Sequence, residues 1–321
     1  MFSKLNEKRP RLSGFKCVSD VAEVTWFAEI LPCFNLKGLS ELSCTSTFFK
    51  NFWEEVKECC KHIDVNQKAK SHICFNNSEI HLCCSTVEKA MDLALVVSQI
   101  KPCTEMDPIT IEMCEGEHEI LDTKIGGMDV TCSHITFVGK GKDKTTVLGG
   151  FSVINKINVK FEEMTATNSR GHGLALMNST AKVVNCSVKE CKWSGMLMLE
   201  GTTATVTQCD FANNGYYGVA GWTRANARLT DCTMHGNELD GLVACVDTVV
   251  ALCGEKTDIH TNKGRGIYAG TRGKVTIHLP PSHKTSHANG SNDDDNRFTG
   301  YDDDDDRGLI VHSNVSPDIK T

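Results

Sequence analysis

The sequence has no long apolar run, no apolar leader and no extended stripe of basic residues. A membrane helix needs about 20 consecutive apolar residues, and no stretch approaches that length. The first residues, MFSKLNEKRPRLSGF, lack the apolar region of a secretory signal. Positive charge is not gathered into the stripe that nucleic-acid binding requires. We therefore expect an intracellular protein, cytoplasmic or nuclear, with neither a membrane nor a nucleic acid as partner.

The 17 cysteines are many for a chain without a secretory signal, and such cysteines are typically reduced and buried. Eight potential metal ligands gather early in the chain: Cys59, Cys60, His62, His72, Cys74, His81, Cys83 and Cys84. They contain no Cys-x-x-Cys pair of the kind that zinc sites use. The segment HICFNNSEIHLCC predicts instead a β-hairpin that turns at residues 76–78. We expect neither a zinc site nor a cofactor.

The net charge of −7 is concentrated near the C-terminus. Eight aspartates lie within residues 293–306, and only Arg297 and Arg307 offset them nearby. Aspartate oxygens can bind calcium. However, a low-complexity run of like charges is typical of a solvated loop, so we interpret this segment as an acidic loop without a metal.

An internal repeat of 20-odd residues organises most of the chain. Five glycines, spaced by 22, 23, 23 and 25 residues, each precede a short apolar stretch: Gly173, Gly195, Gly218, Gly241 and Gly266. Residues alternate within each stretch as they do in β-strands. Two further short strands fit into each repeat, and three strands per repeat are typical of a right-handed parallel β-helix. The predicted fold class is therefore mainly β, with a capping helix and a small N-terminal helical domain.

The repeat assigns structural roles to its recurring residues. Cysteines recur nine residues before the glycines, where a small thiol fits an inward corner. Asparagines recur four residues before them, where amides can form a ladder that satisfies open backbone groups. Val206 is expected in the core. The stretch GLIVH at Gly308 reads as a sixth copy after a disordered insertion at about residues 279–296.

Upstream of the repeats, STVEKAMDLALVVSQI begins with a Ser85-x-x-Glu88 capping box and predicts a helix that covers the open end of the β-helix. The segments ITIEMCEGEHEI, ITFVGKGKDKTTVLGG and FSVINKINVKFEEMTATNSRGHGL follow it. This order resembles the start of right-handed β-helices of the pectin-lyase-like superfamily. Enzymes of that superfamily cleave or epimerise acidic polysaccharides, so the resemblance implies a fold and offers such an activity as one alternative.

The segment Arg170-Gly171-His172-Gly173 resembles the Gly-His-Gly motif of polygalacturonases. In that family the histidine acts beside paired aspartates and an Arg-x-Lys segment. Here Glu162 and Glu163 precede it in place of paired aspartates. His172 is thus the one catalytic candidate, and its alternative role is that of a turn residue.

The outward positions of the strands that follow the glycines are mostly apolar, whereas a groove that cleaves charged sugar needs carboxylates, lysines or arginines there. Apolar strips of this kind bind protein partners or another part of the same chain. We define the apolar strip by the residues expected to bind a partner: Met177, Leu197, Leu199, Trp222, Val243 and Tyr268.

The N-terminal region resembles the later two-thirds of an F-box. The pattern consists of Ile30, Leu31, Leu36, Leu39, Leu42 and Phe49. It departs from the family at Ala22-Glu23 and at Ser46-Thr47, where Leu-Pro and Cys-Lys are usual. F-box helices bind the Skp-type adaptor of a cullin ubiquitin ligase, and some members carry β-helix repeats. The resemblance implies a non-catalytic substrate receptor with that adaptor and a protein substrate as partners.

These observations divide the chain into five parts. They are a flexible N-terminus (1–19), the F-box-like segment (20–62), a linker that can hold the hairpin (63–85), the β-helix with its capping helix (86–315) and a tail (316–321). Two alternatives to the receptor stay open. One is a polysaccharide-active enzyme, favoured by an acidic cluster across the repeats, and the other is a plain interaction scaffold.

Overall fold

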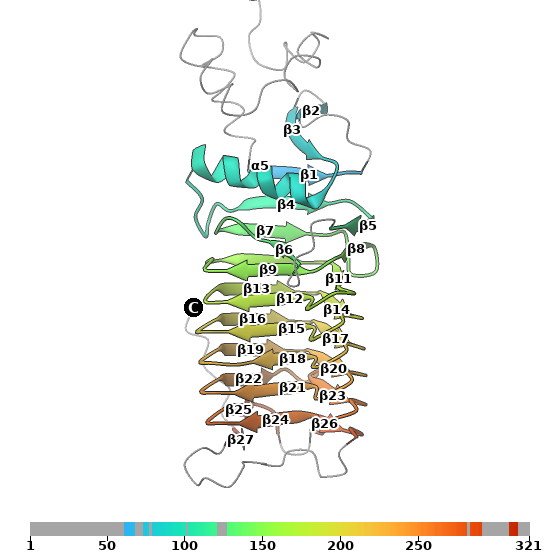
Figure 1. Cartoon of the computed structure of the whole chain (residues 1–321), viewed down its shortest axis with the longest axis vertical. Coiled ribbons are helices and arrows are strands. Elements are labelled where there is room, and N and C mark those ends of the chain that lie inside the picture. Colours follow the sequence, from blue (N-terminus) through green and yellow to red (C-terminus); the bar gives the residue numbers. More distant parts are fainter. Residues whose placement is uncertain are drawn as a thin grey trace, which may run out of the picture.

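The structure, a computed structural model, describes residues 61–67, 73–76, 79–100, 102–120, 127–280, 283–290 and 308–313. They form a right-handed parallel β-helix with three sheets that run along its long axis (Figure 1). Each full repeat contributes one strand to each sheet, because three bends per repeat turn the chain from one sheet to the next. The predicted fold is confirmed.

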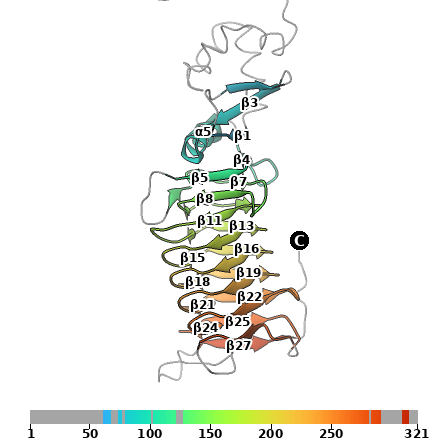
Figure 2. The same ribbon diagram turned by 90° about the vertical axis from the view of Figure 1, so that its right-hand side faces the viewer.

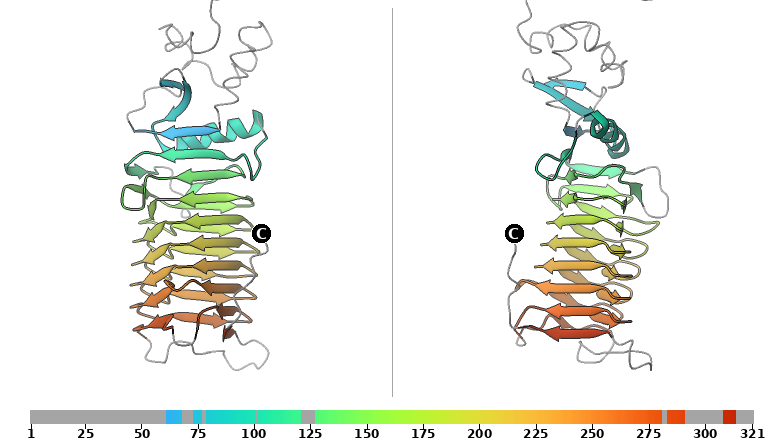
Figure 3. Two further views of the ribbon diagram at one scale, coloured as in Figure 1. Left: turned by 180° about the vertical axis from the view of Figure 1, so that it is seen from behind. Right: turned by 90° about the vertical axis from the view of Figure 1, so that its left-hand side faces the viewer.

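The first sheet has twelve strands and extends over the length of the stack (Figure 3). In spatial order they are β2 (Ile73–Asn76), β3 (Glu79–Cys84), β1 (His62–Val65), β4 (Ile109–Met113), β7 (Ile135–Val138), β10 (Val159–Glu162), β13 (Thr180–Val184), β16 (Thr203–Thr207), β19 (Asn226–Thr230), β22 (Val249–Cys253), β25 (Lys274–Ile277) and β27 (Leu309–His312). Only β2 and β3 pair antiparallel, with Asn76 opposite Glu79, among the strands that the structure describes.

The second sheet has eight strands: β5 (Gly116–Glu119), β8 (Thr145–Leu148), β11 (Thr165–Thr167), β14 (Ser187–Lys189), β17 (Asp210–Ala212), β20 (Thr233–His235), β23 (Asp258–His260) and β26 (Ser286–His287). The third has seven: β6 (Met128–Asp129), β9 (Phe151–Ile154), β12 (Leu174–Met177), β15 (Met196–Leu199), β18 (Val219–Gly221), β21 (Leu242–Cys245) and β24 (Ile267–Gly270). The five repeat glycines each directly precede a strand of this third sheet, as the spacing predicted.

The core lies between the three sheets and follows the predicted alternation. Val206 on β16 is fully buried, while its neighbour Thr205 is exposed. Near the N-terminal end, Phe137, Phe151 and Phe161 come together from different sheets, with ring centroids 4.9 to 5.3 Å apart. These three rings therefore pack together in the core of the early repeats, and Val183, Val206 and Leu229 continue it along the stack.

The cysteine column lies at an inward corner. Cys186, Cys209 and Cys232 are all buried, and the Cys186 amide donates to the Cys209 Sγ at 3.5 Å. Burial raises the pKa of the Cys232 thiol to about 12. The Cys232 thiol therefore stays protonated at neutral pH. All three cysteines serve as small packing groups, as the repeat indicated.

The asparagine column forms a continuous hydrogen-bonded ladder. The Asn214, Asn237 and Asn262 side-chain amides each donate to the Oδ1 of the next asparagine, at 3.0, 2.8 and 2.9 Å. The last acceptor is Asn289. Residues 283–290 therefore continue the repeat, although the sequence placed them in a disordered insertion.

The N-terminal end of the stack is covered by helix α5 (Val87–Ile100), which packs on β1, β3 and β4 (Figure 2). Val87, Ala90, Ala94 and Val97 face this end and are fully buried. The predicted helix is present, but its N-cap is Thr86 rather than Ser85. The Thr86 Oγ1 accepts the Lys89 amide proton at 3.3 Å, because the helix begins one residue later than the capping box implied.

The stretch at Gly308 differs from its prediction. The sequence suggested a sixth strand of the third sheet, yet β27 pairs with β25 in the first sheet, with Leu309 opposite Lys274. A five-residue apolar motif cannot specify which face of the β-helix it joins, because all three faces use short alternating strands.

Two predictions lie outside the described residues: the F-box-like pattern from Ile30 to Phe49 and the acidic loop at 293–306. In the part of the chain that the structure describes, no helix has the length and apolar character needed to cross a membrane.

Candidate functional site

The outer face of the seven-stranded sheet carries an apolar cluster that is separate from the core. We call it the outer cluster. It consists of Leu197, Tyr217, Ala220, Trp222, Val243, Cys245, Val246 and Tyr268. Leu197, Ala220, Val243 and Tyr268 are register partners on four successive strands. The cluster arises because alternation directs these residues outward while Met196, Val219 and Leu242 face the core.

The structure brings together four of the six residues of the apolar strip. Leu197, Trp222 and Tyr268 are partly exposed members of the outer cluster. Val243 also belongs to it, but only 1% of its surface is exposed because its neighbours cover it. Val243 thus supports the face from beneath and is not itself a contact residue. Met177 and Leu199 lie opposite each other at the ends of β12 and β15, both half-buried and outside the cluster.

An ion pair that the sequence did not suggest holds one edge of this face. The Arg265 guanidinium lies over the Tyr268 ring, 3.7 Å from its centroid. Its Nη2 is 3.2 Å from the Oδ2 of Asp240, which is 6% exposed. The contacts fix the position of the Tyr268 ring. A signal was available, because Asp240 and Arg265 each directly precede a repeat glycine.

Burial shifts two titratable groups in the outer cluster. It raises the pKa of the Tyr217 hydroxyl, and the nearby Asp240 carboxylate adds to this rise. Burial also raises the pKa of the Cys245 thiol. Both groups are therefore neutral at physiological pH, and the Arg265–Asp240 pair beside the cluster is internally balanced. The side chains of the outer cluster itself therefore offer uncharged apolar and aromatic contacts.

A second apolar column extends this face onto the adjoining bend. The column consists of one residue from each of three successive repeats: Trp193, Tyr216 and Leu239. The Tyr216 amide donates to the Trp193 carbonyl at 3.1 Å, and the Leu239 amide donates to the Tyr216 carbonyl at 2.9 Å. Tyr216 is 47% and Leu239 is 40% exposed. We call these three residues the bend column. The sequence analysis missed it because the residues differ in type and lie outside the strands.

His172, the catalytic candidate, lies in a bend and is half-buried. Its Nδ1 accepts the Ser194 amide proton at 3.2 Å, and its ring meets the Trp193 ring edge-on at 5.0 Å between centroids. Burial lowers its pKa. Among the described residues, no carboxylate forms a hydrogen bond or ion pair with His172. The surroundings are those of a structural turn residue and supply no acid–base partner.

The eight-stranded sheet displays a histidine ladder that the sequence analysis did not find. His235, His260 and His287 are register partners on β20, β23 and β26. Their rings stack with centroids 5.1 and 5.5 Å apart. The His235 Nε2 is 3.1 Å from Asp210 Oδ1, and the His287 Nε2 is 3.0 Å from Asp258 Oδ1. His260 and His287 follow less regular repeats, which obscured the shared column.

Comparison with known proteins concerns mainly the fold. Residues 129–279 match the family described as a right handed beta helix region. No curated protein matches the sequence. Three solved structures are similar. The Escherichia coli protein YbhC has 9% identity and a TM-score of 0.48, with 78% of this chain and 83% of that chain covered. Pectin methylesterase PemA from Erwinia chrysanthemi has 9% identity and a TM-score of 0.44, with 67% and 76% covered. Pectin methylesterase from carrot has 10% identity and a TM-score of 0.45, with 78% and 87% covered.

Proposed function

We propose that this chain, whose residues 129–279 match the right-handed β-helix region, is a non-catalytic receptor. It would bind a protein partner through the outer cluster. The observation that carries the proposal is the uncharged aromatic and aliphatic surface of Leu197, Trp222 and Tyr268. The bend column extends this surface with exposed Tyr216 and Leu239.

The chemistry of the face favours a protein over an acidic polysaccharide. A carboxylated sugar needs cations to pair with it, and two arginines near the cluster are already paired, Arg265 with Asp240 and Arg272 with Asp247. Aromatic side chains that stand on a rigid sheet are typical anchors of protein interfaces, and truncating such an anchor commonly costs about 2 kcal/mol or more of binding free energy. We therefore expect an apolar protein surface as the partner.

The F-box resemblance extends this proposal. Helices formed by residues Ile30 to Phe49 would bind a Skp-type adaptor through Leu31, Leu36 and Leu39, and the β-helix would present the substrate of a cullin ubiquitin ligase. The test is size-exclusion chromatography of the full chain with purified adaptor at tens of micromolar. Co-elution that is lost in Leu36→Asp supports this role. Separate elution removes the ubiquitin-ligase part and leaves the receptor proposal in place.

The binding face is tested with Trp222→Ser in quantitative pulldowns. Val249→Ser is the matched control, because Val249 is an exposed apolar residue on the twelve-stranded sheet. We expect Trp222→Ser to lose partners that the parent and the control retain, with a nearly unchanged melting temperature. A lowered melting temperature would show that another part of the same chain covers the face. Retention of every partner by Trp222→Ser and Tyr268→Ser would overturn the proposal.

One observation favours the alternative of a polysaccharide-active enzyme. The histidine–aspartate pairs of the histidine ladder place titratable groups on adjacent strands, as acid–base catalysis requires. Incubation with pectin, alginate and polygalacturonate tests this alternative. The receptor proposal predicts no release of reducing or unsaturated ends. Release that disappears in His260→Gln or His172→Ala would establish the enzyme instead.

A further inference from the structure

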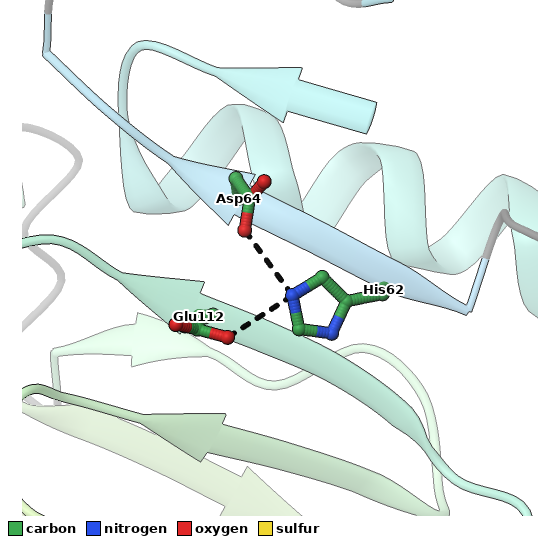
Figure 4. A group of neighbouring side chains, drawn as sticks. All are labelled: His62, Asp64 and Glu112. Atoms are coloured by element: carbon green, nitrogen blue, oxygen red, sulfur yellow. Dashed lines mark hydrogen bonds and ion pairs between the residues drawn. The ribbon is translucent and has the colours of Figure 1, made fainter. Parts of the chain in front are cut away.

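Three side chains with metal-binding atoms converge on the outer face of the first β-helix turn (Figure 4). His62 and Asp64 project from β1, and Glu112 projects from the neighbouring strand β4. Asp64 and Glu112 are register partners in this parallel pair. Ile63 and Val65, which alternate with them, are buried in the core. Alternation therefore fixes all three polar side chains on the same outward surface.

The three donor atoms are spaced as metal ligands are. The His62 Nε2 lies 3.2 Å from the Asp64 Oδ1 and 3.1 Å from the Glu112 Oε2. All three donors lie within 4.8 Å of one another. Metal bonds to nitrogen and oxygen of about 2.0–2.2 Å in a tetrahedral arrangement place neighbouring ligand atoms roughly 3.3 Å apart. Two edges of the observed triangle are close to that value.

Hydrogen bonding alone accounts poorly for this convergence. The Nε2 atom carries at most one proton, yet it faces two carboxylate oxygens at nearly equal distance. Like charges directly opposite each other on neighbouring strands are destabilising, and Asp64 and Glu112 occupy such positions. Lys140 offsets part of this charge through an ion pair with the Glu112 Oε1. The other Glu112 oxygen, Oε2, faces His62, so a cation at the centre of the three donors would meet both carboxylates.

We propose that His62, Asp64 and Glu112 bind a divalent first-row transition-metal ion of the Mn²⁺ or Zn²⁺ type. One imidazole nitrogen and two carboxylate oxygens suit such ions. All three side chains are partly exposed, so water can complete the coordination. The ion would join β1 to β4, and it would stabilise the turn on which helix α5 packs.

The site is tested by titrating the full chain with Mn²⁺ and following the electron paramagnetic resonance signal of the free ion. Mn²⁺ is the probe because it binds thiols weakly, which reduces interference from the cysteines. We expect His62→Gln and Glu112→Gln each to weaken one binding event about tenfold or more. Any Mn²⁺ held by the aspartates at 293–306 would be the same in all variants and would cancel in the comparison.

Two further variants distinguish metal binding at this site from nonspecific attraction of Mn²⁺ to surface carboxylates. His260→Gln is the matched control, because His260 also faces a carboxylate, at 4.0 Å from Asp258, but lies in the histidine ladder. It should bind Mn²⁺ as the parent does. Lys140→Met should bind more tightly, since a competing cation is removed from Glu112. Equal Mn²⁺ affinity in the parent, His62→Gln and Glu112→Gln would overturn the proposal. The three side chains would then form only a hydrogen-bonded triad, with Lys140 paired to Glu112.

Discussion

At the scale of the residue, inward and outward positions of the strands have opposite tolerances for charge. Val206 is fully buried between sheets, whereas Thr205 beside it points to solvent between Lys182 and Arg228 of the flanking strands. Adjacent positions in one strand therefore allow a matched comparison.

Val206→Asp should lower the free energy of unfolding by about 3 kcal/mol or more, because it buries an unpaired charge. Thr205→Asp should change it by less than about 0.5 kcal/mol, since its carboxylate meets solvent and two basic side chains. Urea denaturation of both variants measures the difference. Equal stabilities would show that the strand register is wrong.

His172 should make stability depend on pH. Burial lowers its pKa in the folded protein below the usual 6.5, so the unfolded chain binds a proton more readily. Stability is then fully present above pH 6.5 and is lost as the pH falls toward the folded-state pKa. Melting temperatures between pH 8 and pH 5 should fall less for His172→Gln than for the parent. Parallel curves would contradict this prediction.

At the scale of the element, the asparagine ladder connects the repeats through side chains that are buried from Asn214 to Asn262. Asn237 is fully buried. Its Nδ2 donates to the Phe211 carbonyl at 3.1 Å, and its Oδ1 accepts the Asn214 amide proton at 3.1 Å. The ladder thus satisfies backbone groups that the bends leave open.

Asn237→Ala should cost about 3 kcal/mol of unfolding free energy, because it leaves a buried amide and a buried carbonyl without partners. Asn226→Ala is the control. Asn226 is exposed, and its side chain makes only a 3.5 Å contact to a carbonyl. Thermal unfolding of both variants measures the contrast. A loss below about 1 kcal/mol for Asn237→Ala would mean that water replaces the ladder.

At the scale of the whole molecule, the features that could be predicted from the sequence are those that recur with a regular period. The glycines from Gly173 to Gly266, the buried position of Val206 and the ladder from Asn214 to Asn262 follow from period and alternation. The helix at residues 87–100 followed from its capping residues and apolar spacing, although its first residue did not.

Features that depend on neighbours across repeats could not be predicted in this way. The contact of Arg265 with Asp240 and Tyr268 requires knowing which bend positions stack. His62 and Glu112 are 50 positions apart in the chain, and only the insertion of β1 beside β4 brings them together. The placement of β27 likewise depends on the path of the chain through residues 291–307, which lie outside the described part.

The parallel, in-register stacking has a mechanical consequence. Nearly all hydrogen bonds between repeats run along the long axis, so a force that pulls the two ends of the stack apart loads successive repeats in series. One repeat should detach at a time, beginning at the end opposite α5, where the described residues include no covering helix. Each detachment of 22 to 25 residues should lengthen the chain by about 80 Å, at about 3.3–3.6 Å per residue. Single-molecule stretching should show a series of nearly equal steps, whereas a single large step would mean that the repeats separate together.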